Sequence, residues 1–169
     1  MQSLTPNGLV EYEPGMMADA LMMHLFTCMC VDEEIDRLFH DVDCLSDFMR
    51  AINRPTQTVF KGDEHGIWFL AMYTPHFAGA TFDMYVAPRR RKGKAWVSAM
   101  CEALEYGFEK WPVLIGLTAH ENLLDDHVRM GYIIAGKIPG LWHGKDVHVL
   151  HITRESFNAR ETHLRRRTN

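Results

Sequence analysis

A short basic turn is the part of this sequence whose residues are best suited to bind a phosphate group. The stretch Tyr85–Trp96 holds three arginines and two lysines around Gly93, between a β-rich run and a helix-like run. The first N–H groups of a helix have no partner inside the helix, and the helix dipole adds positive potential there. Glycine also lets the backbone approach a ligand closely, because it has no Cβ. The pattern therefore predicts a site for a diphosphate at the start of a helix.

The same stretch resembles a known signature. The residues from Arg90 to Ala95 read Arg-x-x-Gly-x-Ala, and Tyr-Val-Ala-Pro stands before them at 85–88. This resembles the acetyl-CoA signature of the Gcn5-related N-acetyltransferases, the GNAT superfamily. The resemblance implies a GNAT-like acyl-CoA N-acyltransferase fold, which is an α+β (three-layer α/β) fold with a mixed central sheet flanked by helices. The order of the helices and strands that we expect over about 56–153 resembles the order in this family.

The resemblance also implies which residues bind acetyl-CoA as co-substrate. The backbone of the central strand would pair with the pantetheine arm at Met84, Tyr85 and Val86. The diphosphate would lie over the residues of the turn, namely Arg90, Arg91, Lys92, Gly93, Lys94 and Ala95. The family often has glycine where Arg91 stands and a small or apolar residue where Lys94 stands, so both departures add positive charge. The alternative is a solvated basic turn, or a patch for phosphate-rich partners.

A second region, 120–132, resembles the family's pattern around the residue that protonates the departing thiolate. Anchored on Met130-Gly131-Tyr132, the resemblance places His127 where the family usually has a tyrosine. An imidazolium can donate a proton near neutral pH, so His127 is the candidate general acid. Asn122 is near enough to take the cofactor-binding role of the family's asparagine, whose own place is held by His120. The alternative is an exposed histidine on a polar helix face.

The amine that attacks the thioester must lose a proton, and the family uses a carboxylate on the central strand or ordered water for this step. Asp83 is the one carboxylate in the run 80–86, where a charge is unusual if both faces of the strand are covered. It is the candidate general base, although it could instead pair with a nearby cation. His76 and Glu64 are weaker candidates on flanking turns.

The resemblance implies an N-acetyltransferase that passes an acetyl group to a primary amine by direct attack on the thioester. The acceptor would be an amine-bearing small molecule, a protein lysine or a protein N-terminus. The competing hypothesis is an inactive protein of the same fold that acts as a CoA-binding or protein-interaction module. A nucleic-acid partner for the basic residues at 89–94 and 165–167 is the third and weakest alternative. Oligomeric state stays open, with a homodimer among the alternatives.

Composition sets wider bounds. A chain of 169 residues predicts one domain, here 1–157, followed by a polar basic tail at 158–169. Residues 1–64 hold 12 Asp or Glu against 4 Lys or Arg, which suits a cationic acceptor.

The pair Cys28-x-Cys30 is spaced too closely for common zinc ligands, so we expect no metal. The absence of an apolar run of membrane-spanning length, of a secretion signal and of spaced paired cysteines predicts a cytoplasmic protein. The ending 144–157 resembles small bacteriophage-encoded acyltransferases, which would place the protein in the host cytoplasm.

Periodicity and turn residues predict the elements that must position these side chains. We expect helices over 16–26, 32–39, 47–52 (with Ser46 as N-cap), 95–111 and 121–130. We expect strands over 56–61, 67–73, 80–86, 113–118, 132–138 and 147–153, with Pro139-Gly140 in a loop.

Overall fold

The computed structural model describes residues 8–31, 42–53, 57–91 and 94–159. Its strands are β1 (Val10–Glu11), β2 (Gln57–Asp63), β3 (Gly66–His76), β4 (Gly79–Val86), β5 (Val113–Thr118), β6 (Ile133–Trp142) and β7 (Lys145–Thr153). Its helices are α1 (Met16–Val31), α3 (Leu45–Ile52), α4 (Lys94–Lys110) and α5 (Leu124–Met130), with the short 3₁₀ turns η1 (Pro88–Arg90) and η2 (Glu121–Leu123). Residues 154–159 are also helical. The strands hydrogen-bond in the order β1-β2-β3-β4-β5-β7-β6, and the β4–β5 pair is parallel. The described part of the chain therefore builds a mixed sheet of seven strands.

The chain divides into two compact units, and we describe each by itself. The first unit consists of Met1–Pro75 and Asp83–Leu104, and the second of His76–Phe82 and Glu105–Asn169. Among the described helices, none has the length and apolar character that crossing a membrane requires.

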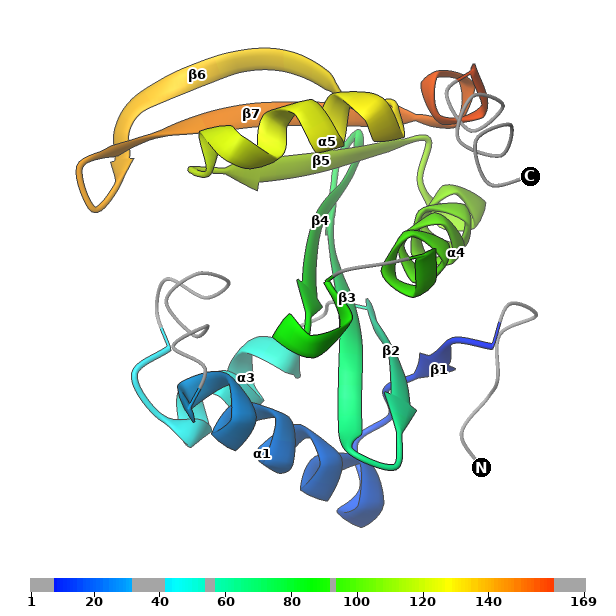
Figure 1. Cartoon of the computed structure of the whole chain (residues 1–169), viewed down its shortest axis with the longest axis vertical. Coiled ribbons are helices and arrows are strands. Elements are labelled where there is room, and N and C mark those ends of the chain that lie inside the picture. Colours follow the sequence, from blue (N-terminus) through cyan, green and yellow to red (C-terminus); the bar gives the residue numbers. More distant parts are fainter. Residues whose placement is uncertain (1–7, 32–41, 54–56, 92–93, 160–169) are drawn as a thin grey trace. The chain divides into compact units, whose positions relative to one another are not determined.

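In the first unit, β3 is a continuous apolar run that is buried from Ile67 to Tyr73. Helix α1 packs beside α3 (Figure 1), where the rings of Phe26 and Phe48 lie 5.3 Å apart. The Tyr73 hydroxyl donates a buried 2.6 Å hydrogen bond to the carbonyl of Ala103 in α4. This bond fastens the middle of α4 to β3.

The apolar residues of helix α1 are buried along one side only. Four side chains at spacings of four, three and four are buried, namely Ala18, Met22, Leu25 and Met29. Met16 and Met17 are 89% and 77% exposed, so the apolar composition here does not mark a helix that is covered on all sides.

In the second unit, β5 pairs with β4 on one side and with β7 on the other. The β4–β5 register covers two residue pairs, Ala80 with Leu114 and Thr81 with Ile115, whereas β5 pairs with β7 along its whole length. The backbones of β4 and β5 approach so closely that a Cβ at Gly79 would lie 2.3 Å from the carbonyl oxygen of Val113.

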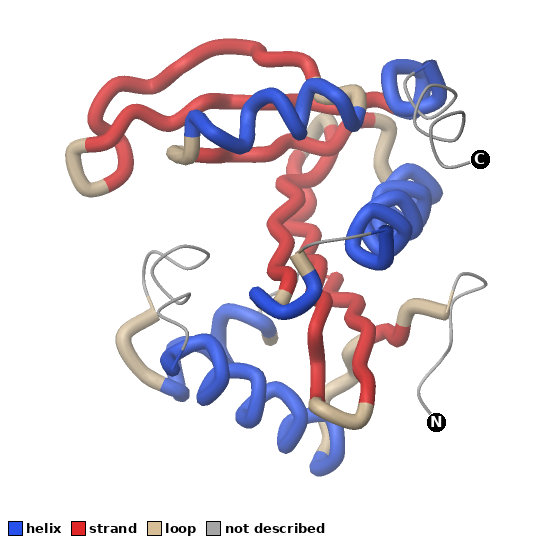
Figure 2. Tube along the Cα trace, in the orientation of Figure 1, coloured by secondary structure: helices blue, strands red, loops and turns tan. Residues whose placement is uncertain are grey.

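Within the second unit, β6 and β7 form an antiparallel hairpin (Figure 2), and β6 lies at the edge of the sheet. The first strand of the hairpin follows Gly131, which caps α5 with a φ of 103°, so the predicted helix end at this glycine is confirmed. A Cβ on Gly131 would lie 2.8 Å from the carbonyl oxygen of Ser156.

Several element predictions are confirmed and some are wrong. The strand at 113–118 has the predicted bounds. The loop expected at Pro139-Gly140 is wrong, because β6 continues to Trp142 through a register shift. The N-cap expected at Ser46 is also wrong, because α3 begins at Leu45 and Cys44 holds the cap position. The helix expected over 32–39 lies outside the described residues.

Candidate functional site

The candidate general base, Asp83, lies in the central strand β4, which leads into the basic turn. Asp83 receives no hydrogen bond and no ion pair from the described residues, so the sequence-based alternative of a nearby cation has no support there. Desolvation by burial raises the pKa of the Asp83 carboxyl from 3.8 to about 6. A carboxylate with a pKa near 6 stays mostly ionised at neutral pH and is a stronger base than an ordinary aspartate.

The end of β4 is tied to its neighbours by backbone and side-chain bonds. Tyr85 is 3% exposed and Val86 is 9% exposed, whereas Met84 is partly exposed. The amide of Ala87 donates to the carbonyl of Trp68 in β3 at 2.8 Å. The strand therefore keeps contact with β3 up to the first residue of the turn.

The basic turn begins as a single 3₁₀ turn. Pro88 stands at its first position, which suits the fixed φ of proline. The amide of Arg90 donates to the carbonyl of Ala87 at 2.8 Å, and the amide of Arg91 donates to the carbonyl of Pro88 at 3.3 Å. The Arg91 amide, which the sequence places under the diphosphate, thus has a partner within the turn.

Two of the three arginines bind a carboxylate. Arg89 donates to Asp63 Oδ1 at 3.0 Å and Arg90 donates to Asp63 Oδ2 at 2.8 Å. The Arg90 guanidinium also lies over the ring of Trp68, 5.4 Å from its centroid. The hydrogen bond from Arg90 is the largest cause that lowers the pKa of Asp63 from 3.8 to about 2, and the His65 amide and Arg89 add to it. The sequence gives no signal for this clamp, which offsets part of the positive charge of the turn.

The third arginine folds back onto the strand. The Arg91 side chain donates from Nε to the carbonyl oxygen of Val86 at 3.0 Å, in a partly buried position. Helix α4 then begins at Lys94, and both Lys94 and Ala95 are exposed at its first turn. Lys92 and Gly93, which the sequence places at the centre of the diphosphate site, lie outside the described residues.

The candidate acid belongs to the second unit. His127 lies in α5, where its Nδ1 is 2.7 Å from the carbonyl oxygen of Leu123. A carbonyl only accepts, so Nδ1 carries the proton and Nε2 is the atom that can exchange one. The His127 ring packs edge-on against Tyr132 at 5.3 Å. Asn122 is exposed in η2, the turn before α5.

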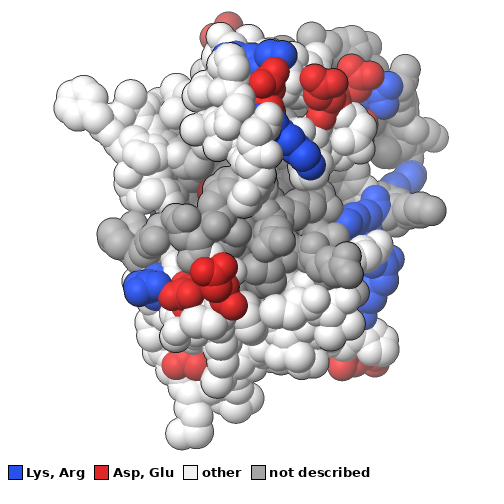
Figure 3. Space-filling view, turned by 90° about the vertical axis from the view of Figure 1, so that its left-hand side faces the viewer, with Lys and Arg blue, Asp and Glu red and all other residues white. Residues whose placement is uncertain are grey.

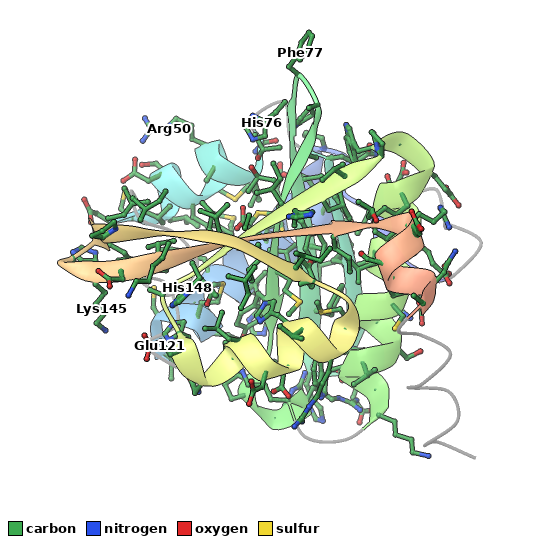
Figure 4. The ribbon with its side chains drawn as sticks, turned by 90° about the horizontal axis from the view of Figure 1, so that it is seen from above. Arg50, His76, Phe77, Glu121, Lys145 and His148 are labelled. Atoms are coloured by element: carbon green, nitrogen blue, oxygen red, sulfur yellow. The ribbon has the colours of Figure 1, made fainter. Side chains whose placement is uncertain are left out.

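The second unit also holds a histidine that the sequence analysis missed. Nε2 of His148 in β7 is buried and receives no hydrogen bond from the described residues. It lies 3.8 Å from Oε1 of the exposed Glu121 in η2, and Figure 4 shows the two side chains near each other. Strand alternation places His148 on the face of β7 opposite Val147, which is the one signal that could have marked it.

In the rest of the described chain, charged side chains and potential metal ligands are dispersed. The face in Figure 3 shows described basic and acidic groups in small clusters among uncharged residues, without one extended basic area. Within the described residues, no three His, Cys, Asp or Glu side chains gather as metal ligands would. At the tip of the β3–β4 hairpin, Phe77 is fully exposed and projects outward (Figure 4).

Comparisons with known proteins address the fold. No protein-family model matches the sequence, and no curated protein sequence matches it. Among solved structures, the chain is similar to a ribosomal-protein-alanine N-acetyltransferase from Brucella melitensis, with 15% identity and a TM-score of 0.63 over 85% of this chain and 98% of that chain. It is similar to an aminoglycoside 6′-N-acetyltransferase complexed with coenzyme A, with 13% identity and a TM-score of 0.62 over 86% and 96% of the two chains.

A third similar structure is a GNAT family acetyltransferase from Elizabethkingia anophelis with acetyl-CoA bound. Its identity is 10% and its TM-score 0.55, over 63% of this chain and 82% of that chain. At such identities the likeness shows the fold. The chain has the GNAT fold, with a mixed seven-stranded sheet and a short parallel β4–β5 pairing, which confirms the fold class predicted from the sequence.

Proposed function

We propose that this chain is an acetyl-CoA-dependent N-acetyltransferase that passes the acetyl group directly to a primary amine. The observation that carries the proposal is Asp83, a desolvated carboxylate on the central strand that no described group neutralises. The fold supports it, because similar structures hold acetyl-CoA or coenzyme A. The Asp83 side chain is partly buried. A carboxylate that is withdrawn from water and not paired is costly to a protein, and such groups are found at catalytic sites.

The proposed chemistry gives one role to each candidate residue. The amine nitrogen forms a bond to the thioester carbon and its proton passes to the Asp83 carboxylate. The C–S bond then breaks, and the departing thiolate takes a proton from the His127 imidazolium. No covalent intermediate on the protein is needed, and most of the rate comes from positioning and from polarisation of the carbonyl.

The proposed cofactor site uses the backbone of Met84, Tyr85 and Val86 for the pantetheine arm. The turn and the start of α4 would hold the diphosphate, because helix N-termini bind anions through their N–H groups. That part of the site includes Lys92 and Gly93 together with Arg90, Arg91, Lys94 and Ala95, and Asn122 would contact the arm. Arg90 would act mainly through the turn that it fastens to Asp63.

Acetyl transfer is tested by release of free thiol from acetyl-CoA with a panel of amines: a polyamine, an aminoglycoside, a peptide with N-terminal alanine and a peptide with an internal lysine. We expect Asp83→Asn to bind acetyl-CoA within a few-fold of the wild type but to lose turnover by about 10²–10⁴-fold, the usual contribution of a general base. Glu109→Gln, at an exposed position of α4, is the matched control with the same change of charge.

The outcomes separate the two hypotheses. Full turnover by Asp83→Asn would remove Asp83 from the mechanism. Binding of acetyl-CoA without thiol release for any amine would favour the non-catalytic CoA-binding module. His127→Phe is expected to keep binding and lower turnover, and unchanged turnover would exclude His127 as the acid.

A further inference from the structure

A buried imidazole nitrogen in β7 has no hydrogen-bond partner. Nε2 of His148 makes no hydrogen bond with the described residues, and 13% of the side chain is exposed. Taking a polar group out of water without giving it a partner costs free energy. The group that Nε2 faces is therefore the place to look for the role of His148.

That group is the carboxylate of Glu121. Its Oε1 lies 3.8 Å from Nε2 of His148, and no other acid in the described part of the chain reaches ion-pair distance of this nitrogen (Figure 4). A lone pair on Nε2 would face negative charge, so the arrangement favours the form in which Nε2 carries a proton. The Glu121 side chain is 78% exposed and has room to shorten the contact to a hydrogen bond.

The other charges beside His148 are paired with each other. Lys137 Nζ lies 2.7 Å from Asp146 Oδ2, and Asp146 Oδ1 accepts from the amide of Gly140 at 3.1 Å. The hydrogen bond from Lys137 is the largest cause that lowers the pKa of Asp146, and the charge of His148 is a smaller one. Asp146 is thus already satisfied, whereas the ion pair of Glu121 within the described residues is the one to His148.

Glu121 belongs to η2, and a hydrogen bond ties the start of this turn to the sheet. The amide of His120 donates to the hydroxyl oxygen of Thr118 at 3.1 Å. Thr118 ends β5 and is paired with His148 in the register of β5 and β7. His148 therefore lies across from the residue that holds the start of η2.

The end of η2 holds the candidate acid. The amide of Leu123 donates to the carbonyl of His120 at 3.0 Å, which closes the turn. The carbonyl oxygen of Leu123 accepts from Nδ1 of His127 at 2.7 Å and so leaves Nε2 of His127 as the atom that exchanges a proton. A shift of η2 would move the Leu123 carbonyl and loosen the bond that selects this tautomer.

We propose that His148 is a positioning residue that holds η2 through Glu121 and thereby keeps the His127 ring in the form that donates from Nε2. His148 acts on the turn and not on the thioester. This inference rests on the proposed function, in which His127 protonates the departing thiolate.

Two variants break the proposed link, Glu121→Ala and His148→Leu. Nitrogen NMR of the neutral His127 ring shows which nitrogen carries the proton, and hydrogen exchange measures the protection of the Leu123 amide. We expect both variants to lower the fraction of His127 with its proton on Nδ1 and to speed exchange at Leu123 several-fold. His148→Gln keeps a donor that can face Glu121 and should restore part of both signals.

Glu155→Ala, at an exposed position of the helical residues 154–159, is the matched control with the same change of charge and should alter neither signal. Thermal melting shows which variants are folded. Because Glu121 is exposed, Glu121→Ala is expected to fold even if His148→Leu does not, and it then carries the test by itself.

Kinetics tests whether the link works through His127. Glu121→Ala should lower kcat about fivefold, the upper worth of a partly exposed ion pair, and leave KM for acetyl-CoA unchanged. In a His127→Phe background the same substitution should have no further effect, because the residue through which Glu121 acts is gone.

Two results would overturn the inference and leave the proposed function in place. One is an unchanged His127 tautomer and unchanged Leu123 exchange in the folded variants. The other is an equal loss of kcat with and without His127, because Glu121 would then act by another route. If the wild type releases no thiol with any amine, the proposed function fails, and the NMR comparison still shows whether or not His148 holds the His127 ring.

Discussion

Replacing Asp83 by asparagine should change how stability depends on pH. The folded state raises the pKa of this carboxyl from 3.8 to about 6, so the folded protein binds its proton more tightly than the unfolded chain does. Where the folded state holds more protons, the free energy of unfolding falls as pH rises. The wild type should therefore lose stability between about pH 4 and about pH 6, and carry the full penalty above that range. A pKa change of this size corresponds to about 3 kcal/mol.

Asparagine keeps the shape of the side chain and cannot ionise, so Asp83→Asn should escape this loss. Urea unfolding of both proteins from pH 4 to pH 8 measures the difference between their free energies of unfolding. We expect that difference to shift in favour of the variant by up to about 3 kcal/mol across the window, and to stay level above it. Glu109→Gln, measured in parallel, should show no such shift. Parallel curves for wild type and Asp83→Asn would refute the statement that the carboxylate is desolvated, and with it the argument for a catalytic base.

Three further substitutions test the surroundings of the site. Tyr73→Phe removes the donor to the Ala103 carbonyl and should lower the free energy of unfolding by about 1 kcal/mol in urea titration. Gly131→Ala should cost about 1–3 kcal/mol by the same measurement, because φ is 103° there and a Cβ would meet the carbonyl of Ser156. Asp63→Asn should lower the melting temperature at neutral pH and reduce the loss of stability that the wild type shows as pH falls toward 2, since the pKa of Asp63 is depressed and its ion pairs exist only above it.

Strands were predictable where the residue types of a run favour a strand and disfavour the alternatives, a helix or a loop. Residues 113–118 are mostly apolar, half of them are β-branched, and they follow Pro112; the structure has a strand with the same bounds. Pro139 misled the prediction for β6, because proline is tolerated in a strand with one neighbour and β6 pairs only with β7 among the described strands. Local sequence does not reveal whether a strand will lie at an edge.

The candidate site was predictable as a stretch of chain but not as a set of contacts. Strand, basic turn and helix follow one another at 80–110 as the sequence indicates. The bonds from Arg89 and Arg90 to Asp63 join residues 26 and 27 positions apart, and no local pattern encodes them. The burial that raises the pKa of Asp83 likewise depends on what packs around β4, whereas the sequence shows only that a charge is out of place there.

The tight passage between Gly79 and the carbonyl of Val113 has a consequence for tracing the ancestry of this chain. Any other amino acid would place its β-carbon against the backbone carbonyl of Val113, which cannot move aside as a flexible side chain could. We therefore expect glycine at position 79 in every related chain that keeps this parallel pairing, even where the rest of the sequence is no longer recognisably similar. A glycine at the opening of the fourth strand is a fixed point from which diverged copies can be aligned.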